Sequence, residues 1–118
     1  MRIRVLGEPI AVKSGKKTAA LKAWIERVRA ESASRRLPPG RYRVRLAFVL
    51  PRERYQATDL QNPHGKDLDN LVAPVLDGLS RAMLKEAGGD GAIVELVATK
   101  RASREAEPPG VRITVSPR

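Results

Sequence analysis

The chain has 118 residues, enough for one compact domain with a modest core and too few for two. It contains no cysteine, which excludes a disulfide scaffold and any thiolate metal site and fits a reducing compartment. The net charge is +10, from 23 Lys and Arg against 13 Asp and Glu. No run approaches the roughly 20 apolar residues that a membrane-spanning helix needs, and the first residues lack a signal peptide's apolar stretch. We therefore expect a single soluble domain over residues 1–118, in the cytoplasm and without a membrane partner.

The charge is unevenly distributed along the chain. Residues 1–66 carry 16 Lys and Arg against 5 acids, whereas residues 67–118 carry 7 against 8. Because Lys and Arg that neutralise phosphates supply most of the nonspecific affinity for nucleic acid, this asymmetry favours a polyanionic partner. A solvated surface on an arginine-rich protein is the alternative explanation of the same charge.

The first third of the chain predicts a strand, a basic loop and a helix. Residues 2–6 alternate between charged and apolar side chains, so Ile3 and Val5 should face inward from a strand. A basic, glycine-containing loop follows at residues 13–17. Thr18 suits an N-cap, and the helix after it fades near Ser34. Its single apolar stripe consists of Leu21, Trp24, Ile25 and Val28.

Residues 42–50 show the clearest strand pattern of the chain. Residues 51–66 lack periodicity and are long for a connector, which is typical of functional or disordered loops. A second apolar face at helical spacing then runs from Leu68 to Met83, and the glycines of residues 88–91 end it.

Two more strands are predicted at residues 93–100 and 111–115, joined by a polar turn as a hairpin. The order of elements is then β-α-β-α-β-β. This order favours an α+β domain of two layers, with the helices packed on a mixed, largely antiparallel sheet.

Carboxylates collect in the segment KDLDN, residues 66–70, where the basic half of the chain ends. On a helix Asp67 and Asp69 would point about 200° apart, whereas in an extended segment residues i and i+2 lie on one side. We therefore expect the pair to precede a helix that starts near Asn70, with Asp69 or Asn70 as its N-cap. Pro74 agrees in part, because proline is tolerated only near the beginning of a helix.

Two carboxylates on one side repel each other unless a cation lies between them, and oxygen-only ligands suit Mg²⁺ or Mn²⁺. Asp90, in a glycine-flanked break before a strand, is a candidate third ligand. The alternative is that Asp69 only caps a helix and Asp90 only occupies a turn, because DxD is a frequent pattern. The spacing alone leaves metal binding open.

The same residues resemble the signature of the RusA-type Holliday junction resolvases. Residues 65–71, GKDLDNL, and residues 75–79, VLDGL, are similar to the family's (P/R)DLDNL block and to the KAVLDAL-like helix after it. Residues 89–96, GDGAIVEL, resemble the family's DDxQVVEL segment, which follows after a similar gap. Residues 5–9 with their trailing lysines are similar to the family's opening strand and basic loop. The resemblance thus spans nearly the whole chain.

This resemblance implies a homodimeric, magnesium-dependent endonuclease that cuts four-way DNA junctions in recombination and repair. By motif position, the catalytic and metal-binding residues would be Asp67, Asp69 and Asp90. They would hold Mg²⁺, or Mn²⁺ in its place, to activate water and to stabilise charge on the cleaved phosphate. Six cations would hold the phosphates that flank the cut: Lys13, Lys16, Lys17, Arg52, Arg54 and Lys66.

The sequence departs from the family pattern at three positions. The family lysine four residues after the second aspartate is Ala73 here, and Gly89 and Ala92 replace an aspartate and a glutamine. Three cations nearby in sequence are candidates to replace the missing ammonium: Lys66, Arg81 and Lys85. These departures also fit a protein that binds branched DNA without cutting it. A basic RNA-binding or ribosome-associated protein is a third reading, which leaves the aspartate spacing unexplained.

Overall fold

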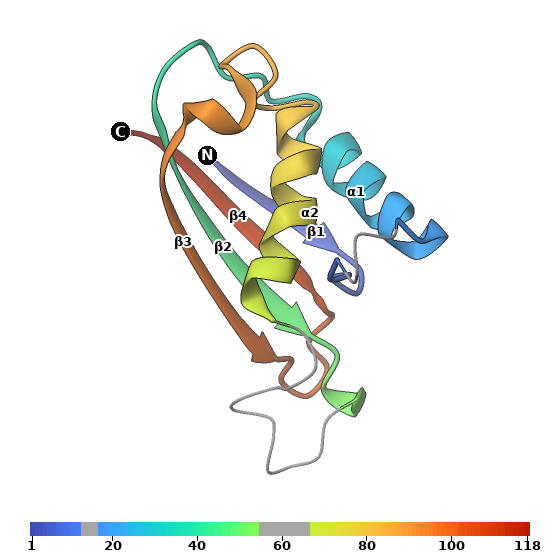
Figure 1. Cartoon of the computed structure of the whole chain (residues 1–118). Helices are drawn as coiled ribbons and strands as arrows, with labels where there is room; N and C mark the ends of the chain where they lie inside the picture. The colour runs from blue at the N-terminus through green and yellow to red at the C-terminus, as the bar shows by residue number, and fades with distance from the viewer. Residues whose placement is uncertain (13–16, 55–66) are drawn as a thin grey trace.

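The computed structural model describes residues 1–12, 17–54 and 67–118 (Figure 1). Its elements are β1 (Arg2–Leu6), α1 (Ala19–Ser32), β2 (Tyr42–Leu50), the 3-10 helix η1 (Arg52–Arg54), α2 (Leu68–Ser80), the 3-10 helix η3 (Gly89–Ala92), β3 (Ile93–Ala102) and β4 (Gly110–Pro117). The predicted order of helices and strands and the α+β class with two layers are confirmed. None of the described helices is long and apolar enough to cross a membrane.

The four strands form one mixed sheet in the order β1-β4-β2-β3. β4 is antiparallel to its neighbours β1 and β2, and β2 is parallel to β3. The steps from β1 to β2 and from β2 to β3 cross the sheet in the same direction, each through a helix. Because such crossovers are right-handed, α1 and α2 lie on the same face of the sheet (Figure 1). In the described part of the chain, the opposite face carries no helix.

The predicted hairpin of the last two strands is wrong, because β3 and β4 are not neighbours in the sheet. The burial of their side chains gives the reason. β4 turns Val111, Ile113 and Val115 into the core, none more than 2 % exposed, whereas Leu96 on β3 is 43 % exposed. The strand with the fully buried apolar set takes the central position between β1 and β2, and the half-exposed β3 forms an edge.

The core lies between the sheet and the two helices. β2 contributes alternate buried side chains from Tyr42 to Leu50, as its pattern predicts. The hydroxyl oxygen of Thr18 accepts a hydrogen bond from the Leu21 N–H at 3.1 Å, so the predicted N-cap of α1 is confirmed. The whole predicted stripe of α1 is buried: Leu21, Trp24, Ile25 and Val28.

α1 and α2 approach closely at Gly78. A Cβ atom at this position would lie 2.8 Å from the Cβ of Val28 and 3.0 Å from the carbonyl oxygen of Ile25. Only a residue without a side chain permits this contact. It fixes α2 against α1 and leaves Asp69 and Ala73 on the exposed side of α2.

Candidate functional site

Asp67 and Asp69 lie at the N-terminal end of α2, which begins earlier than predicted. Asp67 is the N-cap, with extended backbone angles (φ −70°, ψ 141°), and Leu68 is the first helical residue. The prediction that both aspartates precede the helix in an extended segment, with Asp69 or Asn70 as the N-cap, is therefore wrong, because Asp69 is itself helical. Asp69 lies in the first turn, where a negative charge interacts favourably with the helix dipole.

Both carboxylates at this end of α2 are accessible. Asp67 and Asp69 are exposed, and the Asp67 side chain makes no capping hydrogen bond although it occupies the N-cap position. An N-cap aspartate commonly accepts a hydrogen bond from the backbone of the first turn. The carboxylate oxygens of Asp67 are thus not used to cap the helix and are available to a ligand.

The early start places Pro74 within α2, one turn after Asn70. Proline has no N–H to donate to the Asn70 carbonyl, which would leave that oxygen without its helical partner. The Val12 N–H donates to it instead, at 3.0 Å. Val12 is the last described residue before the basic loop of residues 13–17. Pro74 therefore leaves the Asn70 carbonyl free for a hydrogen bond that joins Val12, just before this loop, to the first turn of α2.

Asp90 lies at the opposite end of α2. It belongs to η3, and its Oδ1 accepts a hydrogen bond from the Oγ of Ser80, the last residue of α2. At a rise of about 1.5 Å per residue, α2 separates Leu68 from Ser80 by about 18 Å. Among the described residues, no three acidic or histidine side chains are close enough to hold a metal ion. A single chain therefore does not bring Asp90 to Asp67 and Asp69.

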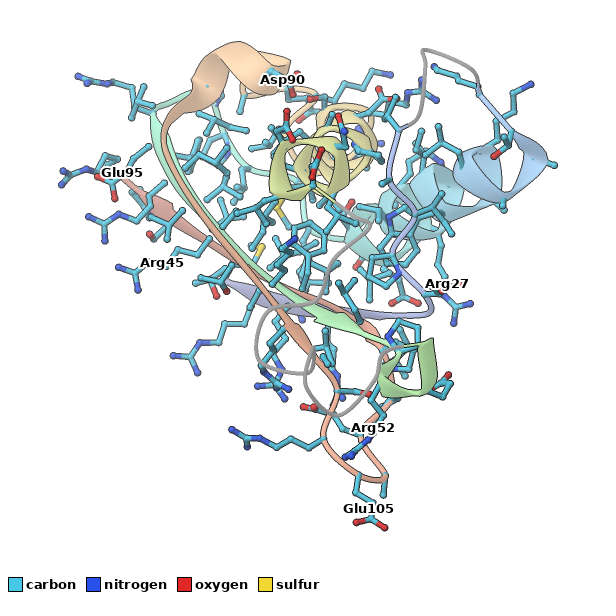
Figure 2. All side chains as sticks on the ribbon, turned by 60° about the horizontal axis from the view of Figure 1, so that its bottom comes forward. Arg27, Arg45, Arg52, Asp90, Glu95 and Glu105 are labelled. Carbon is cyan, nitrogen blue, oxygen red and sulfur yellow. The ribbon has the colours of Figure 1, made fainter. Side chains whose placement is uncertain are left out.

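The predicted DNA-binding cations lie only partly within the described residues. Lys13, Lys16 and Lys66 fall outside them. Lys17 is exposed shortly before α1, and Arg52 is exposed in η1, with its position visible in Figure 2. The backbone N–H of Arg52 donates to the Oγ of Ser103 at 3.1 Å, which holds η1 against the end of β3. Arg54 is the last residue of η1.

Ala73, which stands where the family pattern has lysine, is exposed on α2 one turn after Asp69. Arg81 is the C-cap of α2, and Lys85 follows it. Both cations thus lie at the far end of the helix from Asp69. The hypothesis that either one replaces the missing ammonium is wrong for a site within one chain.

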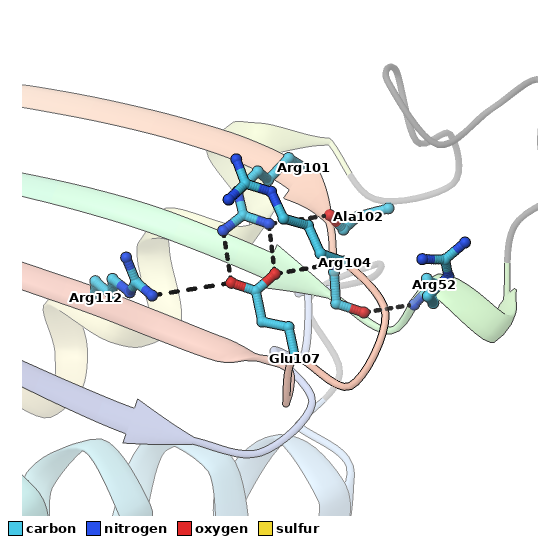
Figure 3. A network of polar contacts seen from close by, with 7 residues as sticks. Arg52, Arg101, Ala102, Arg104, Glu107 and Arg112 are labelled. Carbon is cyan, nitrogen blue, oxygen red and sulfur yellow. Dashed lines mark hydrogen bonds and ion pairs between the residues drawn. The ribbon is translucent and has the colours of Figure 1, made fainter.

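Sequence reasoning missed a polar cluster around Glu107, in the loop between β3 and β4 (Figure 3). The Arg101 guanidinium donates two hydrogen bonds to the Glu107 carboxylate, at 2.6 and 2.7 Å, and the Arg104 backbone N–H donates a third at 2.9 Å. The Arg101 bonds, followed by the Arg104 bond, lower the pKa of Glu107 to about 2. This ionised carboxylate holds the loop closed against the end of the sheet.

The chain matches no protein-family model, and a search of the curated proteins finds no significant relative. The resemblance to the RusA-type resolvases therefore rests only on the sequence motifs of residues 5–9 and 65–96 and on their spacing.

Proposed function

We propose that the protein is a metal-dependent endonuclease of the RusA type, which hydrolyses phosphodiester bonds of four-way DNA junctions. We assign it to recombination and repair in the cytoplasm. One observation carries the proposal: Asp67 and Asp69 present two exposed carboxylates at the start of α2, directly after the basic half of the chain. The cations of residues 1–66 would attract a phosphate backbone, and the two carboxylates would hold a metal ion.

The donor set at the start of α2 fits Mg²⁺ or Mn²⁺. Carboxylate oxygens are the ligands these ions prefer, and Mg²⁺ commonly takes one or two carboxylates and completes its shell with water and substrate phosphate. Asp67 and Asp69 match this pattern because both are exposed and the Asp67 carboxylate makes no capping hydrogen bond. An ion held by these carboxylates would supply Lewis-acid polarisation of the phosphate and a more acidic water.

The remaining residues of this site bind and orient the DNA. The hydrogen bond from Val12 to Asn70 places Val12, the residue before the basic loop, beside the first turn of α2. Lys17, at the other end of that loop, is exposed. We propose that the cations of this part of the chain hold a phosphate near the carboxylates, so that one segment of DNA backbone meets both the cations and the metal.

Asp90 lies apart from the other two aspartates of the proposed site. Because it lies about 18 Å along α2 from Asp67 within its own chain, it can share a metal with Asp67 only when a second copy presents it. Symmetric cutting of a four-way junction needs two active sites related by a two-fold axis, which a homodimer provides. We therefore infer that a dimer either completes each site with the Asp90 of the other subunit or leaves Asp90 outside the chemistry.

The test is incubation of the purified protein with a labelled four-way junction, in Mg²⁺, in Mn²⁺ and in chelator. Native gels report binding, and denaturing gels report strand scission. Paired nicks near the branch point that require the metal support the nuclease. Intact strands in both metals contradict it.

A second candidate function is binding of branched DNA without cleavage. It is favoured by the exposed Ala73 in place of a lysine, and by the position of Arg81 and Lys85 at the far end of α2. In the same assay this protein would give a shifted native band with intact strands in every metal. Its affinity would fall steeply with salt.

A further inference from the structure

The open face of the sheet, opposite the helices, holds a hollow of about 670 Å³. Four arginines from three neighbouring strands line it: Arg2 and Arg4 from β1, Arg112 from β4 and Arg45 from β2. The short side chains of Ala47 and Thr114 lie among these arginines and leave the space open. In Figure 2, Arg45 projects from the sheet away from α1 and α2.

The strand register places these guanidinium groups close together. Arg4 lies directly opposite Arg112, and Thr114 lies between Arg2 and Arg45 in one row across the sheet. Neighbouring strands are about 4.8 Å apart, and alternate residues of one strand about 6.8 Å. Like charges directly opposite each other destabilise a sheet. An anion bound among the four arginines would remove this repulsion.

Acidic partners lie at the two ends of this face. Glu95 forms ion pairs with Arg43 and Arg118 at one end. Glu107 pairs with Arg101 at the other end, in the cluster of Figure 3. The shorter ion pairs of these carboxylates are therefore made with arginines outside the hollow.

The arginines inside the hollow are left with little neutralisation. Glu107 reaches Arg112 only at 3.9 Å. Within the described part of the chain, Arg2, Arg4 and Arg45 form no ion pair with an acidic side chain. Their positive charge is thus available to a ligand from outside.

We propose that this open face binds the phosphate backbone of double-stranded DNA, as a second contact surface for the branched substrate. Arginine binds phosphate through its planar fork, and threonines such as Thr114 can donate to phosphate oxygens. The hollow is far smaller than a duplex, so it takes a stretch of backbone and positions the DNA without reading bases. The inference rests on the proposed function for its ligand, and it does not depend on cleavage.

This surface extends the substrate contacts of the proposed nuclease. The start of α2 lies on the helical face of the sheet, whereas the hollow lies on the opposite face. A four-way junction has four duplex arms that point in different directions. A second basic surface would hold an arm that the α2 surface does not reach.

The test compares two variants that lose the same charge. Arg4→Gln with Arg45→Gln removes two arginines of the hollow. Lys22→Gln with Arg27→Gln removes two exposed cations of α1, on the other side of the molecule, as Figure 2 shows for Arg27 and Arg45. Binding to a labelled duplex and to a four-way junction is measured in chelator between about 50 and 200 mM salt.

We expect the hollow variant to bind about tenfold more weakly. The slope of log affinity against log salt should be less steep by about two, one unit for each lost phosphate contact. Arg45→Gln alone should lower the slope by about one. The α1 variant should bind like the wild type. Because Arg4 faces Arg112, the hollow variant should unfold at a temperature no lower than the wild type.

An unchanged slope in the hollow variant would overturn the inference, and so would an equal loss in the α1 variant. A change of oligomeric state in the hollow variant, seen by sedimentation, would also overturn it and identify the face as a contact between copies. Nicking assays on the same proteins separate the two proposals. If the hollow variant loses binding and the wild type does not nick the junction, only the nuclease proposal is refuted. If the wild type nicks the junction and the hollow variant binds with unchanged affinity, only this inference is refuted.

Discussion

At the scale of single residues, the three aspartates of the motif differ in the contacts that their side chains make. Asp67 and Asp69 are exposed at the start of α2, and the Asp67 side chain makes no capping hydrogen bond. Asp90 accepts a hydrogen bond from Ser80 and so joins η3 to the end of α2. The chemistry of the proposed site therefore depends most directly on the first two carboxylates.

Asp69→Asn tests this role. The amide is a poor ligand for Mg²⁺ compared with a carboxylate, so cleavage of a four-way junction should fall below detection. Loss of a negative charge near phosphates should leave binding of the junction unchanged or stronger. Gel assays of nicking and binding measure both. Cleavage that survives in Asp69→Asn would remove this residue from the mechanism.

Glu107 gives a pH-dependent test of the fold. Its pKa is lowered from 4.5 to about 2 in the folded chain, so its contribution to stability is complete above about pH 4.5 and is lost as the pH falls toward 2. At neutral pH, Glu107→Gln should lower the free energy of unfolding by about 1–3 kcal/mol, because hydrogen bonds to a charged group are lost.

Urea unfolding of wild type and Glu107→Gln at several pH values measures this effect. The difference in stability between the two proteins should shrink as the pH falls from about 4.5 to about 2. The control is Glu105→Gln, an exposed carboxylate in the same loop that points into solvent in Figure 2. A difference for Glu107→Gln that stays constant with pH would contradict the argument.

At the scale of elements, sequence patterns correctly predicted the features that depend on residues close together in the chain. The boundaries of β1 and β2, the Thr18 cap and the buried stripe of α1 follow from alternation, capping and helical spacing. The start of α2 did not follow, because the Asn70 carbonyl that Pro74 leaves free finds its donor in Val12, far away in sequence. The prediction that β3 and β4 form a hairpin was wrong for a similar reason, because which strands take the central positions of the sheet depends on all four strands.

The same limit applies to the sites. The spacing of Asp67 and Asp69 predicted that both precede a helix, which the structure confirms for Asp67 but not for Asp69, because Asp69 lies in the first turn of α2. The separation of Asp90 from them depends on the length and direction of α2, which the motif does not show. Arg2 and Arg4 were expected to face outward, and their convergence with Arg45 becomes visible only once the strand order is known.

Gly78→Ala tests the contact between α1 and α2. Alanine favours a helix over glycine by about 1 kcal/mol, but its Cβ would lie 2.8 Å from Val28 and force the helices apart. Overpacking of a core costs about 1–3 kcal/mol, so we expect net destabilisation of about 1 kcal/mol. Thermal unfolding measures it, with Gly91→Ala as the control because no atom lies within 4 Å of its added Cβ. Equal stability of Gly78→Ala and wild type would show that the helices adjust freely.

At the scale of the whole molecule, α2 sets the geometry of the proposed nuclease. It holds Asp67 and Asp69 at one end and Asp90 at the other, about 18 Å away. If a two-fold axis brings two copies together with their α2 helices antiparallel, each end of one helix lies beside the opposite end of the other. Each of the two sites would then combine Asp69 of one subunit with Asp90 of its partner.

Mixing two inactive variants tests this arrangement. Asp69→Asn and Asp90→Asn should each abolish nicking alone if both residues serve the metal site. After subunit exchange in an equal mixture, each mixed dimer would contain one site with both aspartates intact and one with neither. Nicking should then recover to about a quarter of the wild-type rate, because half of the dimers are mixed and each has one working site. A mixture that stays inactive although exchange is complete would mean that no site is shared between subunits. Activity of Asp90→Asn alone would instead leave Asp90 as a structural partner of Ser80, and would assign the metal to the start of α2 within one chain.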